Sequence, residues 1–306
     1  MARYLLSRLL HSVITLLGAS IFIFVLLRVV PGDPAAMLLP EGAPQSAVDT
    51  LNREMGLDEP LYTQYFIFVR NALTADFGES FQYRDPALDV VTERIPATIA
   101  LTTAAMFLTV TFGVLIGILA AAHRGSRYDY SGTVLAVLGQ SLPNFWLGIM
   151  LILFFGVRLG WLPTSGFDGP KSLILPAITL AAYPTALVAR LTRSSMLEVL
   201  GQDYVRTGRA KGLPERVVVL RHAFRNAAIP VLTVIGLQIG TLLGGAVITE
   251  SVFAWPGVGK LVVDAVFFRD FPIVQTILIL LITTFIVINL LVDIAYAFLD
   301  PRIRYW

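Results

Sequence analysis

The sequence contains no cysteine, which excludes disulfide bonds, thiolate catalysis and cysteine-ligated zinc sites. Charge is scarce as well: 14% of the 306 residues are charged, against about 25% in a typical soluble domain. Apolar residues make up 56% of the chain, and the mean hydropathy is +0.74. This composition predicts a membrane protein.

Catalytic motifs are missing too. Neither H-E-x-x-H nor G-x-S-x-G occurs, which argues against an intramembrane enzyme. Gly259-Lys260 is followed by Leu261 and lacks the upstream glycine of a phosphate-binding loop. The three histidines are scattered, and we interpret them as interfacial or loop residues: His11, His123 and His222. We therefore expect no catalytic residue, no metal site and no cofactor bound by this chain.

Long apolar runs without any acidic or basic residue are the main positive signal. A bilayer core of about 30 Å requires roughly 20 apolar residues in a helix. The shortest of the six charge-free windows has 18 residues. The windows predict an all-α polytopic membrane protein with six transmembrane helices: Leu9–Leu27, Ile95–Ala122, Tyr130–Val157, Ser172–Ala189, Asn226–Thr249 and Phe271–Val292.

Lysine and arginine are distributed unequally between the two sides that these windows define. If the N-terminus is cytoplasmic, 14 of the 23 basic residues lie in the cytoplasmic segments and eight in the longer segments opposite. This asymmetry predicts that both termini are cytoplasmic. The first window is too long for a signal-peptide core, so we interpret it as a retained anchor. We divide the chain into residues 1–30, an extracytoplasmic segment 31–94, and a core 95–306 containing loops 190–225 and 250–270.

The extracytoplasmic segment carries local helix signals. Pro31-Gly32-Asp33-Pro34 ends the first helix, and Asp33 is placed to cap a helix starting at Pro34. Ser46 with Asp49 resembles a capping box before Leu51–Met55, and Gly56 ends that helix. Leu61–Leu73 is amphipathic. Its apolar residues predict a helix that lies in the membrane interface or on other spans, or forms a simple lid: Tyr62, Tyr65, Phe66 and Val69.

Glycines at helical spacing mark two spans. Gly113 and Gly117 lie one turn apart in the second window, while Gly236, Gly240 and Gly244, backed by Gly245, repeat in the fifth. Such stripes let another helix approach closely. Packing is the first interpretation; the alternative is that the fifth helix meets a partner's helix across a translocation pathway.

Polar residues at membrane depth are few. Gln140 to Asn144 surround Pro143 in the third window and predict a kink, either packed, or a hinge lining a pathway. Asn289 and Asp293 share a helix face, for which we favour a structural ion pair or hydrogen bond. Gln238 is the polar residue that accompanies the glycines of the fifth window.

Residues 190–225 are far more basic than orientation requires, with eight basic residues against Glu198, Asp203 and Glu215. We predict two short helices here. The first ends near Lys211, with Gly212 in the left-handed position, and the second begins with Pro214 at its first helical position. Such an elbow suits docking to a soluble partner; the alternative is a loop with an ordinary positive bias.

The stretch from Asp203 to Gly212, followed by Arg225-Asn226-Ala227-Ala228-Ile229-Pro230, resembles the EAA-type loop of ABC importer permeases, in the form found in the dipeptide, oligopeptide and nickel family. Further similar motifs cover nearly the whole chain: Pro31–Pro34, Gly56–Pro60, Asp76–Gly78, Arg94–Thr98, Gly160–Pro163, Trp255–Gly259 and Asp300–Tyr305. The last of these resembles the first permease of such pairs.

The resemblance implies a type I ABC importer permease fold in the bacterial inner membrane. It implies a second homologous permease, two ATPases that bind ATP and Mg²⁺, an extracytoplasmic substrate-binding protein, the lipid bilayer, and no nucleic acid. Arg206 to Gly212 would form the coupling helix. Gly208 departs from the expected alanine. The residues expected to couple to the ATPases are Asp203, Tyr204, Arg206, Thr207, Gly208, Arg209, Ala210, Lys211 and Gly212.

The resemblance favours short peptides as substrate, with glutathione or nickel chelates as alternatives. A rival of another class, an ion-coupled secondary transporter, would be expected to show intramembrane ionisable groups, broken helices or inverted repeats. Asp293 is the single candidate among ionisable groups, and the sequence shows no convincing internal repeat. Six residues are expected to line the pathway or pack its helices: Gln140, Asn144, Gly236, Gln238, Gly240 and Gly244.

Overall fold

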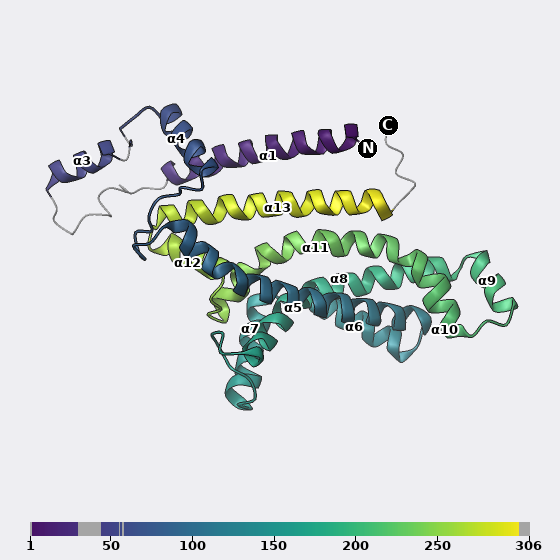
Figure 1. Ribbon diagram of the computed structural model, residues 1–306. Coiled ribbons are helices and arrows are strands. Elements are labelled where there is room, and N and C mark those ends of the chain that lie inside the picture. Colours follow the sequence, from purple (N-terminus) through teal and green to yellow (C-terminus); the bar gives the residue numbers. More distant parts are fainter. Residues whose placement is uncertain (1, 30–43, 55, 57, 300–306) are drawn as a thin grey trace. The chain divides into compact units, whose positions relative to one another are not determined.

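The computed structural model describes residues 2–29, 44–54, 56 and 58–299 (Figure 1). Nearly all of them are helical, and their β pairing is limited to one isolated bridge between Glu79 and Pro86. The predicted cap at Asp33, the helix end at Met55 and the motif Asp300–Tyr305 lie outside the described residues. The chain divides into two compact units, Met1–Pro96 with Leu261–Trp306, and Ala97–Lys260. This is a division by packing, and the division by membrane side remains a prediction.

In the first unit, α1 (Ala2–Val29) packs along α13 (Phe271–Leu299) (Figure 1). Asp270 precedes α13 and accepts a hydrogen bond from the backbone N–H of Ile273 at 3.4 Å, as an N-terminal cap does. The same carboxylate accepts the hydroxyl of Ser80 at 2.5 Å. This buried aspartate therefore fixes the loop before α5 to the start of α13.

The helix α4 (Leu61–Leu73) has the predicted bounds and packs on α1. Tyr65 hydrogen bonds to Ser20 at 2.9 Å, and Gln64 accepts Nε of Arg28 at 2.7 Å. Its predicted apolar face is divided, because Tyr65 lies against α1 whereas Tyr62 and Phe66 are 74% and 77% exposed. Packing on another span is thus confirmed for one side of the helix.

The helix α3 (Gln45–Glu54) corrects the capping-box prediction. Ser46 lies inside the first turn, where its carbonyl accepts the Thr50 hydroxyl, so it does not cap. Asp49 instead accepts the side-chain amide of Gln45 at 3.1 Å. Gly56, with φ of +66°, has the left-handed conformation predicted for a helix end.

In the second unit, α8 (Ile174–Leu200) is the central helix. It contacts α6 (Arg127–Ser141), α7 (Asn144–Leu151) and α11 (Phe224–Val252). Small residues of α8 pack with those of α5 (Ala87–Ala122), α11 and the loop that follows it. This core consists of Ala97, Leu101, Ala105, Ala177, Leu180, Ala181, Leu242, Ala246 and Trp255. Five of these nine residues are alanines, whose small side chains let helix backbones approach closely.

The third predicted span is broken. The chain bends by 106° between α6 and α7, which continues as a π-helix, η1 (Ile152–Arg158). Leu142 has extended backbone angles (φ −82°, ψ 127°), as residues before proline do, and Pro143 cannot donate to the preceding turn. The described residues therefore contain five helices able to span a membrane, or six spans if the bent pair counts as one.

Two predicted spans are parts of longer helices. The helix α5 begins at Ala87, ahead of Ile95, and continues through Pro96. The fifth window lies in a run of 38 residues that comprises α10 (Glu215–Val217), the π-helix η3 (Val218–Ala223) and α11. The second short helix predicted after Gly212 is therefore the start of this longer run. Pro214 is the N-cap of α10, and the first helical residue is Glu215, so the prediction that Pro214 occupies the first helical position is wrong.

The remaining elements are short. A 3₁₀ turn, η2 (Pro170–Leu173), leads into α8. In chain order, the short helix α9 (Asp203–Ala210) lies between α8 and α10. The helix α12 (Val258–Phe267) follows α11.

Candidate functional site

The predicted coupling segment is the helix α9 with its C-terminal turn. Gly212 has a φ of +75°, and its N–H donates to the carbonyl of Arg209 at 2.9 Å. The N–H of Leu213 reaches back to the carbonyl of Gly208 at 3.4 Å. These two bonds form the Schellman ending of a helix, which favours glycine at the left-handed position. The predicted role of Gly212 as a helix terminator is confirmed.

Gly208 lies beneath Leu213 in this ending. A Cβ atom added at position 208 would meet Cδ1 of Leu213 at 3.7 Å, an ordinary contact. Alanine therefore fits at this position, and the glycine is not required by space. Its effect is to make α9 about 0.5–1 kcal/mol less stable than alanine would.

Three contacts hold α9 to the run that leads into α11. Val205 is fully buried. The side-chain amide of Asn226 donates to the hydroxyl of Tyr204 at 2.7 Å. Arg209 forms a two-pronged ion pair with Glu215, at 3.1 and 2.7 Å, and this hydrogen bond raises the pKa of Arg209. These contacts join α9 to the helical run that contains the fifth predicted span.

The opposite surface of α9 is exposed and polar. Arg206 pairs with Asp203 at 3.5 Å, and both side chains are largely in solvent, where such a pair contributes little to stability. The structure brings the nine predicted coupling residues together on this helix and its C-terminal turn, with Val205 turned inward. We call α9 with residues 211 and 212 the coupling surface; its docking to an ATPase remains a prediction.

The glycines of α5 pack against α8. A Cβ atom at Gly113 would lie 2.9 Å from the Val188 side chain, and one at Gly117 would lie 2.7 Å from the carbonyl oxygen of Ala189. Real Cβ atoms do not approach this closely, so both positions require glycine. The predicted close packing at this stripe is confirmed.

The glycines of α11 behave differently. Gly240 is buried and Gly236 is half-buried, whereas Gly244 is exposed and a Cβ added there would meet no atom within 4 Å. Between them, Gln238 is buried and accepts the hydroxyl of Thr241. Contacts within the described chain do not explain Gly244, which leaves its role facing a partner as a prediction.

The polar residues of the third window lie on both sides of its break. Gln140 is in the last turn of α6, and its buried Nε2 has no hydrogen-bond partner among the described residues. Asn144 is the first residue of α7 and is half-buried. The predicted kink is confirmed and is much sharper than a proline bend; lining of a pathway remains a prediction. In α13, Asn289 is half-buried, and the side chain of Asp293 lies outside what the structure describes.

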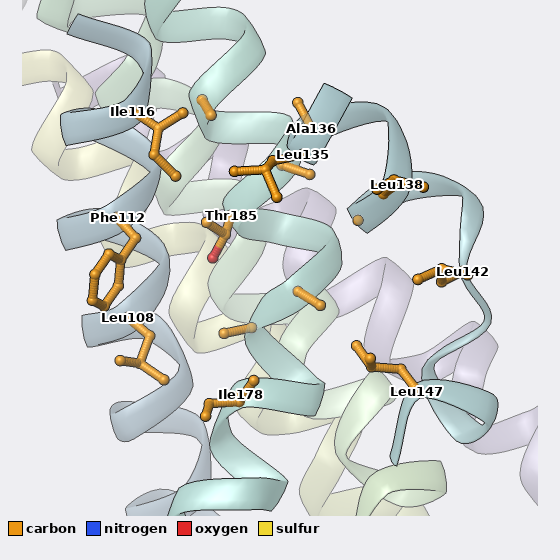
Figure 2. Close-up of a pocket in the computed structure, with 15 residues that line it drawn as sticks. Leu108, Phe112, Ile116, Leu135, Ala136, Leu138, Leu142, Leu147, Ile178 and Thr185 are labelled. Carbon is orange, nitrogen blue, oxygen red and sulfur yellow. The ribbon is translucent and has the colours of Figure 1, made fainter. Parts of the chain in front are cut away.

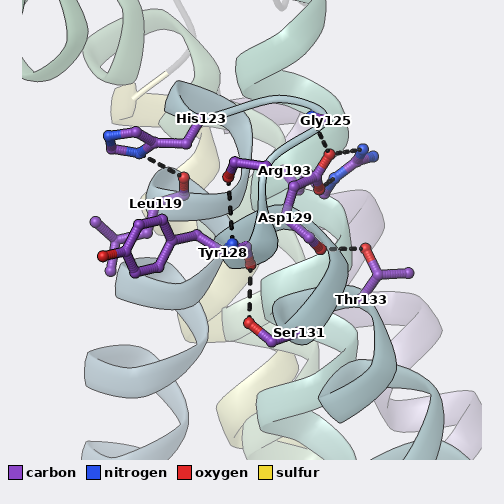
Figure 3. A network of polar contacts seen from close by, with 9 residues as sticks. Leu119, His123, Gly125, Tyr128, Asp129, Ser131, Thr133 and Arg193 are labelled. Carbon is purple, nitrogen blue, oxygen red and sulfur yellow. Dashed lines mark hydrogen bonds and ion pairs between the residues drawn. The ribbon is translucent and has the colours of Figure 1, made fainter.

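A polar network that the sequence analysis missed holds the α5–α6 turn to α8 (Figure 3). Nε and NH2 of Arg193 donate to the two carboxylate oxygens of Asp129 at 2.5 and 3.0 Å, and the N–H of Gly125 donates to the same carboxylate at 3.0 Å. Asp129 is buried. Its signal in the sequence is an acidic residue in the first turn of an apolar helix.

Removing this pair should destabilise the protein measurably. Asp129→Asn is expected to lower the free energy of unfolding by about 2–3 kcal/mol, because a guanidinium that is two-thirds buried loses its charged partner. Exchanging the charges, with Asp129→Arg and Arg193→Asp, should not restore stability, because the Gly125 N–H would then face a cation. Thermal unfolding of the purified variants measures this, and full rescue by the exchange would contradict it.

A second missed residue is Glu250, near the end of α11. It is fully buried and accepts the Thr98 hydroxyl at 2.7 Å and the Lys260 N–H at 3.0 Å. The Val258 N–H donates in turn to the Thr98 oxygen at 2.8 Å. The carboxylate thus satisfies the first N–H groups of α12, as an anion at a helix N-terminus does. Its sequence signal is an acidic residue at the end of an apolar run, five positions before the Trp255–Gly259 motif.

Comparison with known proteins decides the family. Residues 113–305 match the family described as "Binding-protein-dependent transport system inner membrane component", and residues 1–102 match its N-terminal companion. The chain belongs to the ABC importer permeases. It is 45% identical over 305 residues to the glutathione transport system permease protein GsiC of Escherichia coli K12, with complete coverage of both chains. It is 44% identical over 321 residues to the di/tripeptide transport system permease protein DppB of Pseudomonas aeruginosa, with 95% coverage of each.

Solved structures support the fold of this permease. The inward-facing MetNI methionine ABC transporter aligns with a TM-score of 0.59 at 18% identity, covering 69% of this chain and 96% of that one. An amino acid ABC transporter aligns with a TM-score of 0.55 at 15% identity, covering 68% and 94%. The predicted all-helical importer permease fold is confirmed.

The family settles several further predictions about this ABC importer permease. It is an inner-membrane, multi-pass transport subunit and not an enzyme, because ATP hydrolysis belongs to the partner ATPase. The rival interpretation, an ion-coupled secondary transporter, is wrong.

Proposed function

We propose that this permease forms half of the translocation pathway of an importer for short peptides. Its similarity along nearly the whole chain to both a di/tripeptide permease and a glutathione permease supports this. Glutathione is itself a tripeptide, so the two relatives share one class of substrate: a small, flexible peptide with charged ends. Import of nickel chelates is the alternative that the test must exclude.

We further propose the assembly that such importers use. A second homologous permease completes the pathway, two ATPases bind ATP and Mg²⁺ on the cytoplasmic side, and a binding protein delivers the peptide outside. Both termini are then cytoplasmic, which agrees with the excess of basic residues on that side. The exposed coupling surface lies on the same side. ATP binding drives transport only if the inward- and outward-open states differ in their affinity for the peptide or its binding protein.

The substrate proposal is tested by uptake into proteoliposomes that contain the permease with its co-expressed subunits and binding protein. Labelled dialanine should accumulate only with ATP inside, and excess glutathione or a tripeptide should compete with it. A nickel chelate should not compete. Uptake of the chelate, with no uptake of either peptide, would overturn the proposal while leaving the family assignment intact.

The coupling proposal is tested separately through ATPase association. Gly212→Asp forces a side chain into a left-handed conformation at a cost of about 1–2 kcal/mol and removes the turn that orients α9. We expect the ATPases to be lost from the purified complex, as after deletion of Arg206 to Lys211. Gly208→Ala is the matched control, since its Cβ has room, and it should retain them. ATPases bound in normal amounts to Gly212→Asp would contradict a docking role for this surface.

A further inference from the structure

An apolar cavity of about 500 Å³ lies between α5, α6 and α8 in the second unit (Figure 2). Its lining includes Leu108, Phe112 and Ile116 from α5 and Leu135 and Leu138 from α6. Thr185 is the single lining residue with a polar side chain. A peptide with charged ends would lose its hydration here without finding partners, so the cavity is not a substrate site.

The break in the third window leaves this cavity open on one side. The helix α6 ends at Ser141, and the chain turns away by 106°. Three lining residues are exposed in the described chain, although they belong to segments apolar enough to span a membrane: Leu135 (58%), Leu138 (49%) and Phe112 (51%). An apolar cavity does not hold ordered water. At membrane depth, hydrocarbon is the solvent that can fill it.

The apolar faces of α5 and α6 that line the cavity lead to two aromatic residues at the turn between these helices. His123 lies seven residues after Ile116, and Tyr128 lies seven before Leu135, so each continues its helix's lining face by two turns, or about 10 Å. Their rings are 5.5 Å apart (Figure 3). Tyr128 is 65% exposed. An exposed tyrosine at the end of a span is typical of the lipid headgroup level.

The turn between these two rings is rich in positive charge. Residues 123–127 contain Arg124 and Arg127 and no acidic residue, and both arginines are exposed. Asp129, the carboxylate that interacts with Arg124, is ion-paired with Arg193. An apolar slot that ends in a tyrosine and two exposed arginines matches the chemistry of an acyl chain attached to a phosphate.

We propose that this cavity binds an anionic phospholipid. One acyl chain occupies the space between α5, α6 and α8, and the phosphate lies against the turn 123–128, where Arg124 and Arg127 attract it and Tyr128 can donate a hydrogen bond. The two turns of helix between the cavity and the turn correspond to the glycerol region of the lipid. The lipid fills the gap left by the broken span.

The test uses the full-length permease, purified with its co-expressed subunits, in nanodiscs that contain a trace of photoactivatable lipid. One probe is phosphatidylglycerol with a diazirine in its acyl chain, and the comparison probe is the phosphatidylcholine analogue. Cross-linked peptides are identified by mass spectrometry. We expect peptides of α5, α6 and α8 to be labelled preferentially by phosphatidylglycerol.

Two variants and their matched controls make the result specific. Arg124→Gln with Arg127→Gln should reduce the phosphatidylglycerol labelling by roughly fivefold for each arginine removed, whereas Arg216→Gln with Arg221→Gln, also exposed, should leave it unchanged. Leu135→Trp should block labelling by filling the cavity. Val137→Trp, which places the same ring on an exposed position of α6 outside the cavity, should not.

Equal labelling by the two lipids, unaffected by the arginine variants, would overturn the proposal and indicate ordinary contact with bulk lipid. Absence of label from either lipid on the cavity peptides of α5, α6 and α8 would also overturn it, because the surface would then be closed to lipid in the assembled complex. Preferential labelling that responds to both variants and to neither control would establish the site.

Discussion

Gly117→Leu is expected to abolish most of the folded, membrane-inserted permease. A Cβ atom at this position would lie 2.7 Å from the backbone oxygen of Ala189, in addition to overlapping the Thr192 side chain. Because the carbonyl belongs to α8, relief requires α5 and α8 to separate along their shared core. Forcing side-chain atoms into a filled contact typically costs 1–3 kcal/mol, and a clash with backbone should exceed about 3 kcal/mol. Fluorescence-detected size exclusion and thermal unfolding measure the loss.

The control for this change is Gly244→Leu. Both substitutions put a leucine into a membrane-spanning helix, but a Cβ atom at Gly244 meets no atom within 4 Å and the position is exposed. The isolated chain should therefore keep its folded yield with Gly244→Leu. Gly113→Ala should fall between the two, because it adds one carbon where leucine adds four, although that carbon would lie 2.9 Å from Cβ and Cγ1 of Val188. Equal yields for Gly117→Leu and Gly244→Leu would refute the close helix contact.

Glu250→Ala should produce the second-largest loss. The substitution removes the acceptor for the Thr98 hydroxyl and the Lys260 N–H, in a place that water does not reach. Each buried donor left without a partner costs about 1–3 kcal/mol, so the loss of the acceptor for two donors should cost about 2–6 kcal/mol. The start of α12 should also detach from α5, because Val258 is held through the same hydroxyl.

Graded substitutions distinguish the contribution of the Glu250 carboxylate to stability from that of the Thr98 hydroxyl. Glu250→Gln keeps one acceptor and should lose less stability than Glu250→Ala. In a double-mutant cycle, Thr98→Val combined with Glu250→Ala should be clearly less destabilising than the sum of the single changes, because the two groups form one network. Ser251→Ala, at an exposed position next to Glu250, should be near neutral. Additive losses in the cycle would contradict the network.

The spans were predictable because the bilayer imposes a length of apolar sequence on every crossing helix. Charge-free windows located the five spanning helices, and the third window fell on the bent pair α6 and α7, but the windows did not give the helix ends. The fifth run begins at Glu215 and α5 begins at Ala87, since a helix continues into water wherever polar residues allow it. The break at Pro143 was visible in the sequence, whereas its angle of 106° depends on how α7 packs on α8 and α11.

The coupling surface was predictable for a local reason. A glycine in the left-handed position and a following proline determine where α9 ends, and both effects act within a few residues. Glu250 and Thr98 lie 152 positions apart, and Asp129 and Arg193 lie 64 apart. No local pattern pairs such residues, because the contact exists only after the helices have packed. Each appeared in the sequence merely as an isolated polar residue near the end of an apolar run.

The helical run from Glu215 to Val252 is long compared with the contacts at its ends. Its 38 residues extend about 57 Å, so a rigid tilt of one degree about one end moves the other by roughly 1 Å. The first residues of the run and of α11 contact α9 through Arg209 and Tyr204, and Glu250 near its other end accepts a hydrogen bond from the start of α12. A rigid tilt of this run is how the proposed docking at α9 would reach the start of α12.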